Sequence, residues 1–344
     1  MRIRSRAPLR IGLAGGGTDL PSYSNEFGGA VFNATIKMHA YCTIEPTTNG
    51  RISITANDNN NSIDVESVPY LDICGNELIL HKGVYNRIVK DFNMGKPLSF
   101  NMSTSNDAPV GSGLGTSSTM IVAILEAFDT WLKLGLTAYD KAQLAYSIER
   151  EDLNLAGGKQ DQYSAVFGGF NLMEFKKDGT TTINPLNVSK NTLNELESSL
   201  LLYYNGRSRS SSKIINEQIK NTSSKNQVTL DAMHRLKECA YEMRDSVLYG
   251  DLNGFANILK ETWEQKKKTS SIISNKELDI IINFAFLNGA KAIKVSGAGG
   301  GGFLMLYCYP DDRQRLIDAL KTMRGTIYPV NFTDKGAESW ILGV

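Results

Sequence analysis

Hydrophobic and polar residues alternate through much of the first hundred residues, which is the pattern of half-buried β-strands. The segments AVFNATI, AYCTIEP, RISITAN and LSFNMS show this alternation, and polar stretches such as NDNNNS separate them. Segments that follow one another so closely usually pair as neighbours in a sheet. The pattern therefore predicts a mostly antiparallel sheet in the first part of the chain.

Apolar residues recur at helical spacing over residues 118–133 and 137–153, and Thr137 stands where an N-cap is expected. The same helical spacing is found over residues 229–250, 251–265, 275–290 and 310–323. Between the last two of these, AIKVSGAGGGGFLMLYCY has the pattern of two strands joined by a glycine-rich turn. Helices packed on antiparallel sheets make an α+β protein.

The length of 344 residues predicts two domains with a ligand cleft between them. The pattern places the boundary near residues 180–195, which gives an N-terminal domain over residues 1–185 and a C-terminal domain over residues 186–344. Within the second domain, KNTSSKNQ (220–227) has no apolar periodicity and is interpreted as a mobile loop.

The charge balance and the cysteine content argue against several kinds of binding partner and structural site. Lys and Arg total 37 against 36 Asp and Glu, so no overall positive charge attracts nucleic acid or an acidic membrane. The four cysteines form no C-x-x-C pair, which argues against a zinc site and a disulfide framework. Neither a signal-peptide core nor a stretch of about 20 apolar residues is found, so we expect a soluble cytoplasmic protein that contacts no membrane.

Three glycine clusters are the candidates for function: IGLAGGGTD (11–19), PVGSGLGTSST (109–119) and VSGAGGGGF (295–303). The middle cluster precedes a predicted helix, where bare backbone N–H groups and the positive helix end together favour a phosphate. It is no Walker A loop, because Thr or Ser replaces the required Lys. The last cluster satisfies G-x-G-x-x-G in letters, but a strand follows it where a dinucleotide site needs a helix.

The three clusters together resemble the motifs of the GHMP kinases. The family pattern P-x-x-x-G-L-G-S-S-A is similar to PVGSGLGTSS, with Ser118 where alanine is usual, and the other motifs match APLRIGLAGGGTDL and KVSGAGGGGF. The resemblance implies an N-terminal domain like domain 2 of ribosomal protein S5, a ferredoxin-like C-terminal domain, and ATP bound in the cleft. The residues that this resemblance assigns to ATP are Pro109, Gly111, Ser112, Gly113, Leu114, Gly115, Thr116, Ser117 and Ser118.

The resemblance also implies the residues that would carry out phosphoryl transfer. Glu149 precedes Asp161 by twelve residues, as a magnesium-binding acid precedes G-x-x-D-Q in the family. By that register Asp161 is the candidate catalytic base, and Ser117 and Glu149 are the candidate ligands of Mg²⁺. Arg10 matches a basic residue that lies beside the catalytic Asp in relatives. The alternatives are an N-cap for Asp161, a solvated helix face for Glu149 and a surface ion pair for Arg10.

The first motif bears on which molecule would accept the phosphoryl group, because Asp19 matches the Asp of the galactokinase motif G-E-H-T-D. Gly16 and Gly17 stand here in place of its Glu and His, so a different or bulkier ligand is expected. The segments around Asp19 and Asp161 are most similar to those of heptose 7-phosphate kinases, which phosphorylate the anomeric hydroxyl. The residues considered for binding the sugar phosphate are Asp19, Gly16, Gly17, Lys159, Arg207, Arg209, Gly299 and Gly300, together with Lys213 of the predicted loop 203–213.

Other functions remain open at this stage. A fucokinase or uronic-acid kinase of the same family would differ in the charge of its acceptor. A catalytically idle, galactokinase-like sensor would bind ATP and a sugar without turnover, and Arg10, Glu149 and Asp161 together argue against it. An RNA-binding role for the S5-like half is disfavoured by the balanced charge. The three histidines are scattered and support no hydrolase triad. The anomer preference and the oligomeric state are not determined by the sequence.

Overall fold

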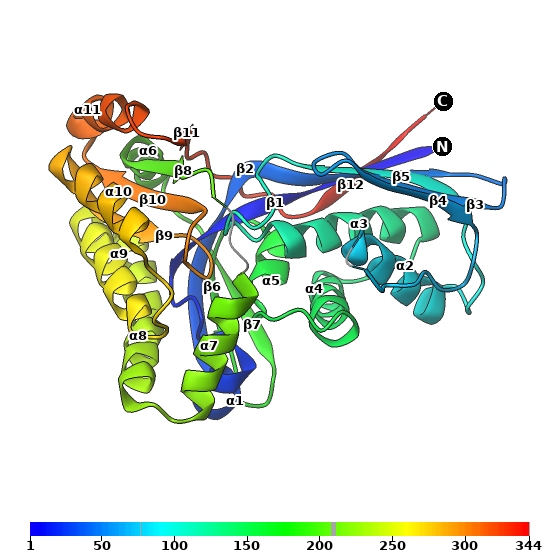
Figure 1. Cartoon of the computed structure of the whole chain (residues 1–344), viewed down its shortest axis with the longest axis horizontal. Coiled ribbons are helices and arrows are strands. Elements are labelled where there is room, and N and C mark those ends of the chain that lie inside the picture. The colour runs from blue at the N-terminus through cyan, green and yellow to red at the C-terminus, as the bar shows by residue number, and fades with distance from the viewer. Residues whose placement is uncertain (76, 208–210, 344) are drawn as a thin grey trace.

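Two β-sheets form the framework of the computed structural model, which describes residues 1–75, 77–207 and 211–343 (Figure 1). The larger sheet has the order β12-β1-β2-β5-β3-β4, and β6 also pairs with β2 and with β7. All its pairings are antiparallel except that of β3 with β5, as the alternation predicted. Its strands are β1 (Arg2–Ala14), β2 (Gly29–Pro46), β3 (Arg51–Ala56), β4 (Asn61–Glu66), β5 (Phe100–Asn106), β6 (Phe170–Phe175), β7 (Thr181–Leu186) and β12 (Glu338–Leu342).

The smaller sheet is antiparallel throughout, with the order β11-β8-β10-β9. Its strands are β8 (Leu200–Tyr204), β9 (Ala290–Val295), β10 (Phe303–Cys308) and β11 (Thr326–Pro329). In chain order these are its first to fourth strands, so the spatial order is 4-1-3-2. This is the order of a ferredoxin-like sheet, in agreement with the expected fold of the second half.

Helices cover both sheets. They are α1 (Pro21–Phe27), α2 (Ile79–Phe92), α3 (Thr116–Leu132), α4 (Ala138–Ser147), the π-helical turn η1 (Ile148–Asp152), α5 (Gln160–Phe167), α6 (Lys190–Ser199), α7 (Ser211–Ser223), α8 (Gln227–Tyr249), α9 (Leu252–Lys267), α10 (Lys276–Leu287) and α11 (Pro310–Lys321). Figure 1 shows α2 to α5 on one side of the long strands and α8 to α11 around the smaller sheet. None of the helices in the described part of the chain combines the length and apolar composition that crossing a bilayer demands.

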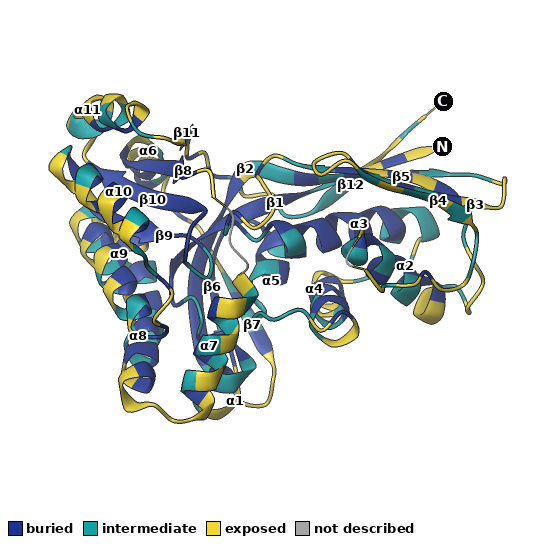
Figure 2. Ribbon diagram, in the orientation of Figure 1, coloured by how far each residue is buried: buried dark blue, intermediate teal, exposed yellow. Residues whose placement is uncertain are grey.

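The hydrophobic core is divided between the two sheets and the helices that face them. One cluster joins α2 and α3 to β2, β3 and β5. Another runs from β1 and β2 to α8, α9 and the smaller sheet, so the two halves of the molecule share buried apolar contacts. Figure 2 shows the strands buried in the middle of the molecule, with exposed residues on the outer helix faces. Because these buried apolar contacts fix the two sheets relative to each other, the segments that lie between the sheets are also held in fixed positions.

The prediction of a mobile loop over residues 220–227 is wrong. Residues 220–223 form the last turn of α7, and α8 begins at Gln227. Asn226 caps α8, since its side chain accepts a hydrogen bond from the N–H of Thr229. The buried side chains of Ile214, Gln218 and Thr222 give α7 one inward face, which the short apolar pattern did not reveal. The same helix includes residues 211–213 of the predicted basic loop.

The predicted boundary between residues 185 and 186 assigns the last strand to the second domain, but the strand lies elsewhere. Strand β12 pairs with β1 from Arg2↔Leu342 to Arg6↔Glu338, so the end of the chain lies in the larger sheet. The physical reason is that β1 has a free edge that the final segment can pair with. For the rest of the chain, the division stays a prediction.

Thr137 provides a test of the helix-capping rules, because it is the N-cap that the sequence predicted. Its hydroxyl accepts from the N–H of Asp140, and the Asp140 carboxylate accepts from the N–H of Thr137, which completes a capping box. We expect Thr137→Ala to lower the free energy of unfolding by about 1 kcal/mol. Urea unfolding measures this, with Thr137→Ser as the control that keeps the cap. Equal stability of the Ala variant and the wild type would contradict the assignment.

Candidate active site

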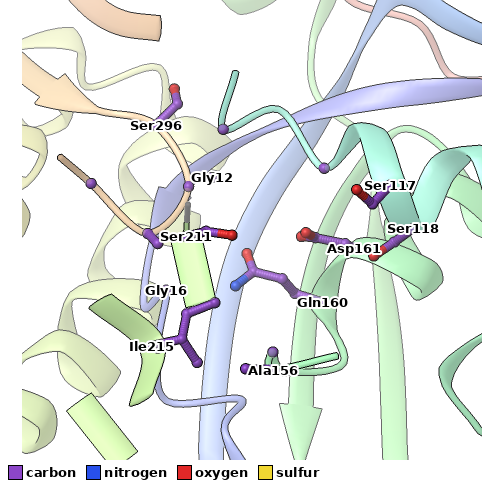
Figure 3. A pocket seen from close by; sticks show the side chains of 18 of the residues that line it. Gly12, Gly16, Ser117, Ser118, Ala156, Gln160, Asp161, Ser211, Ile215 and Ser296 are labelled. Carbon is purple, nitrogen blue, oxygen red and sulfur yellow. The ribbon is translucent and has the colours of Figure 1, made fainter. Parts of the chain in front are cut away.

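A cavity of about 480 Å³ opens where the glycine clusters, α3, α5 and α9 meet. Its walls come from both halves of the chain, including β1 of the larger sheet and β9 of the smaller one. In the view of Figure 3, Gln160 and Asp161 lie between Ser117 and Ser118 on one side and Gly12, Gly16 and Ser296 on the other. The three glycine clusters that stood out in the sequence therefore line one space.

The middle cluster forms the loop that precedes α3. Gly111, Gly113 and Gly115 have φ values of 73°, 89° and 81°, which glycine adopts far more readily than other residues. Gly115 is the N-cap of α3, and no side chain caps this helix end. Its first N–H groups are consequently free to bind an anion, and the helix dipole favours one there.

Most of the predicted ATP-binding residues line the cavity. These are Gly111, Gly113, Gly115, Thr116, Ser117 and Ser118. Pro109, Ser112 and Leu114 do not line it. Leu114 is fully buried in the shared core, and Ser112 lies beneath the third glycine cluster, where its carbonyl accepts from the N–H of Phe303 at 2.9 Å. Leu114 and Ser112 thus anchor the loop to the core and to the third glycine cluster.

The second and third clusters pack backbone against backbone. A Cβ atom on Gly113 would lie 2.6 Å from the Ser296 carbonyl oxygen, and one on Gly302 would lie 2.3 Å from that of Ser112. Both distances are shorter than any side chain tolerates. Glycine at these positions is thus required for the two loops, and with them the two halves of the molecule, to approach so closely.

Arg10 binds both the candidate base, Asp161, and the glycine-rich loop before α3 (109–115), which is the candidate nucleotide loop. Its Nη2 lies 2.6 Å from Asp161 Oδ1, its Nε donates to the same oxygen at 2.7 Å, and its Nη1 donates to the Gly113 carbonyl at 2.7 Å. The Arg10 side chain is only 5% exposed, so this is no surface ion pair. The Asp161 carboxylate also lies against Gly115, whose absent side chain leaves room for it. A charged carboxylate is thereby fixed beside the positive end of α3.

Glu149 is buried and lines the same cavity from η1. Its Oε2 accepts from the Ser118 hydroxyl and from Gln162 Nε2, both at 2.6 Å, and Arg150 lies 3.2 Å from its other oxygen. Burial raises the pKa of Glu149 above its usual value, while the Arg150 charge opposes that shift. The Glu149 side chain therefore does not lie on a solvated helix face. The hydroxyl bonded to it belongs to Ser118, the neighbour of the predicted ligand Ser117.

Asp19 is held rigidly on the other side of Asp161. Its two oxygens accept from the Gln160 N–H at 3.1 Å, from Gln160 Nε2 at 3.0 Å and from the Gly17 N–H at 3.1 Å. A Cβ atom on Gly158 would lie 1.9 Å from Asp19 Oδ2, so the G-G-K-Q turn must have glycine there. Gly16 and Gly17 line the cavity next to this carboxylate.

The basic residues proposed for the sugar phosphate do not converge on the cavity. Lys159 donates from Nζ to the Gly179 carbonyl at 2.7 Å, and Arg207 pairs with Glu277 at 2.7 Å; neither lines the cavity. Gly299 lines it, whereas Gly300 bonds from its N–H to the Ile273 carbonyl and does not. Arg209 lies outside the described residues.

Two cavity lysines were missed by the sequence analysis. Lys266, at the end of α9, donates to the Gly297 carbonyl, and Lys294, on β9, donates to the Gly12 carbonyl. Burial lowers the pKa of Lys266 to about 8 and that of Lys294 well below its ordinary value. Lys266 belongs to the run KKK, which is typical of a solvated face. Of the two lysines, only Lys294 could have been recognised as buried from the sequence, because it lies between Ile293 and Val295 in the pattern of a buried strand.

Comparison with known proteins shows to which family the chain belongs. The family model for the GHMP kinases N terminal domain matches residues 80–169, and that for the GHMP kinases C terminal domain matches residues 236–324. The chain is 43% identical to a D-glycero-alpha-D-manno-heptose 7-phosphate kinase of Campylobacter jejuni over 98% of both chains. The chain belongs to the GHMP kinases. The two-domain fold and the three motifs of this GHMP kinase are those expected from its sequence.

Solved structures of other GHMP kinases extend the comparison. A D-glycero-D-manno-heptose 1-phosphate kinase from Bacteroides thetaiotaomicron is 44% identical, with a TM-score of 0.86 over 99% of this chain and all of that one. The mevalonate kinase of Methanococcus jannaschii is 18% identical with a TM-score of 0.76, covering 97% of this chain and 98% of that one, so it shares the fold alone.

The contact between the two glycine loops generates a prediction for Gly113. We expect Gly113→Ala to weaken ATP binding at least tenfold, about 1.4 kcal/mol, because the methyl group would force the loop away from Ser296. The matched control is Gly135→Ala, which has a similar positive φ of 69° but no atom within 4 Å of the new Cβ. Titration with a nonhydrolysable ATP analogue measures both. Equal affinities of the two variants would show that the loop contact is not needed for nucleotide binding.

Proposed function

We propose that this GHMP kinase transfers the γ-phosphoryl group of ATP to the anomeric hydroxyl of a sugar phosphate, and that the acceptor is D-glycero-D-manno-heptose 7-phosphate. The product would be the 1,7-bisphosphate. The observation that carries the proposal is the Asp161 carboxylate, held by Arg10 at 2.6 Å beside the free N-terminus of α3. The identity of 43–44% with two heptose phosphate kinases supports the choice of sugar.

In the proposed reaction, Asp161 accepts the proton of the anomeric hydroxyl as that oxygen attacks the γ-phosphorus and ADP leaves. The free N–H groups of the loop and of α3 bind the nucleotide's phosphate oxygens. Arg10 keeps the carboxylate oriented and offsets negative charge that develops during transfer. Phosphoryl transfer requires mainly that the attacking and leaving oxygens lie in line and that the charge on the moving group is neutralised, and these groups would serve both needs.

The residues around Glu149 fit a magnesium ion. A carboxylate and a hydroxyl are hard oxygen donors, and Mg²⁺ usually binds one or two such protein groups together with phosphates and water. Glu149 and Ser117 line the cavity on the side of the nucleotide loop, so we propose that they hold the ion. When bound, it would neutralise charge on the phosphate oxygens.

Asp19 is proposed to accept hydrogen bonds from the sugar hydroxyls. Three donors from Gln160 and Gly17 fix its carboxylate without exhausting its lone pairs. Gly16 and Gly17 leave open the space that larger side chains would fill, which suits a seven-carbon sugar with a phosphate.

Acceptor preference is the direct test of the proposal. The panel comprises heptose 7-phosphate, heptose 1-phosphate, unphosphorylated heptose, L-fucose, galactose and uronic acids, each with ATP and magnesium. We expect heptose 7-phosphate to react fastest, and ³¹P NMR to locate the new phosphate on the anomeric carbon. Heptose 1-phosphate is included because one relative's name gives this phosphate position. Preference for it, or for L-fucose, would overturn the proposed acceptor.

Asp161→Asn tests the proposed base. The substitution keeps the size of the side chain but removes the proton acceptor, so we expect kcat to fall at least ~10²-fold while ATP affinity is retained. The control is Asp318→Asn on α11, an exposed carboxylate paired with Lys321 at 3.1 Å. Coupled ADP-release kinetics report turnover. Wild-type kcat in the Asp161 variant would remove this residue from the mechanism.

A further inference from the structure

Lys266 and Lys294 are two buried amines that lie in the cavity without a carboxylate paired to either of them among the described residues. Their side chains belong to residues that are 4% and 2% exposed, and both line the cavity. Within residues 1–75, 77–207 and 211–343, neither amine forms an ion pair. Buried cations are stable only when an anion or a full set of hydrogen bonds compensates them. An anionic group of a ligand would stabilise the charged form of both amines.

The nearby carboxylates are already engaged. Asp161 is bound twice by Arg10, and Asp19 accepts from Gln160 and Gly17. Each ammonium has three N–H donors, and one donor of each is used by a main-chain carbonyl. Further donors on both amines are thus available to a ligand in the cavity.

The two amines face the first glycine cluster. A Cβ atom on Gly16 would lie 3.8 Å from Lys266 Nζ and 3.8 Å from Gln160 Nε2, and one on Gly12 would lie 3.8 Å from Lys294 Nζ. The space left open by these glycines is therefore lined by both amines and by the Gln160 amide, whose acceptor Oε1 would lie 3.6 Å from the Cβ atom on Gly12. Figure 3 shows Gly12 and Gly16 on the opposite side of Gln160 and Asp161 from Ser117 and Ser118 of the nucleotide loop.

We propose that Lys266 and Lys294 bind the phosphate group that the acceptor sugar carries before the reaction, an inference that rests on the proposed function. The ligand class is a sugar phosphomonoester, whose dianion would favour the charged form of both amines and accept hydrogen bonds from them. Gln160 Nε2 supplies a further donor toward the same space. The buried Ser296 hydroxyl also lines the cavity and has no partner in the described part of the chain.

This assignment separates the two phosphate-binding functions of the cavity. The nucleotide is bound by main-chain N–H groups at the start of α3, and the acceptor by side-chain cations from α9 and β9. A dianion beside Lys266 and Lys294 would also counter the burial that lowers the pKa of both amines. The lysines thus distinguish a phosphorylated sugar from a neutral one.

The experiment compares Lys266→Met and Lys294→Met with wild type by calorimetric titration of heptose 7-phosphate and of a nonhydrolysable ATP analogue. We expect at least tenfold weaker binding of the sugar phosphate and less than a twofold change for the nucleotide. Lys267→Met is the matched control, because Lys267 is one residue along α9 and pairs with Glu264 at the surface. It should bind both ligands as the wild type does.

Unchanged sugar-phosphate affinity in both variants, or equal weakening of both ligands in folded variants, would overturn the inference. If a variant does not fold, a wild-type crystal soaked with heptose 7-phosphate decides, since the phosphate must lie within hydrogen-bond distance of both Nζ atoms. Wild-type protein that binds and phosphorylates no sugar phosphate would instead refute the proposed function, and the inference with it.

Discussion

The guanidinium of Arg10 is the contact on which the site depends, because it joins three segments that are distant in the sequence. From β1 it reaches the carboxylate of Asp161 on α5 and the carbonyl of Gly113 in the nucleotide loop. A charge-assisted pair with two donors to one oxygen has little freedom to rotate. The proposed proton acceptor and the loop proposed to bind phosphate are thereby fixed relative to each other, and such preorganisation would lower the cost of reaching the transition state.

Close approach of main chain to main chain provides the second constraint. Gly113 and Gly302 bring the loops of the two halves together at distances that no side chain allows. The cavity is lined by glycine backbone and by buried charged side chains, together with apolar side chains that include Leu20, Leu155 and Ile215. Such a lining suits phosphates, because N–H groups and ammonium ions replace the water that these anions lose on binding.

Much of this arrangement could be predicted from the sequence. The strand alternation, the Thr137 cap and the glycine clusters act over a few residues, so local rules were sufficient for them. The pairing of Arg10 with Asp161 was expected only through family resemblance, and the geometry agrees with it. Lys159 and Arg207 do not line the cavity, because sequence proximity to the site does not fix the direction of a side chain.

The features that escaped prediction depend on contacts between distant segments. Lys266 is buried only because α9 packs against β9 and the third glycine cluster, and no local pattern distinguishes it from its partly exposed neighbour Lys267. The helix α7 was missed for a related reason, since three buried positions among polar residues give a weak apolar pattern.

The pairing of β12 with β1 has a consequence for synthesis on the ribosome. The outer edge of β1 acquires its neighbour only when β12, more than 300 residues further along the chain, has left the exit tunnel. Until then, the backbone N–H and C=O groups along that edge can pair with another nascent chain. Shortening the chain by its final strand would expose the same edge permanently, so such truncated products would tend to aggregate even though every residue around the cavity is intact.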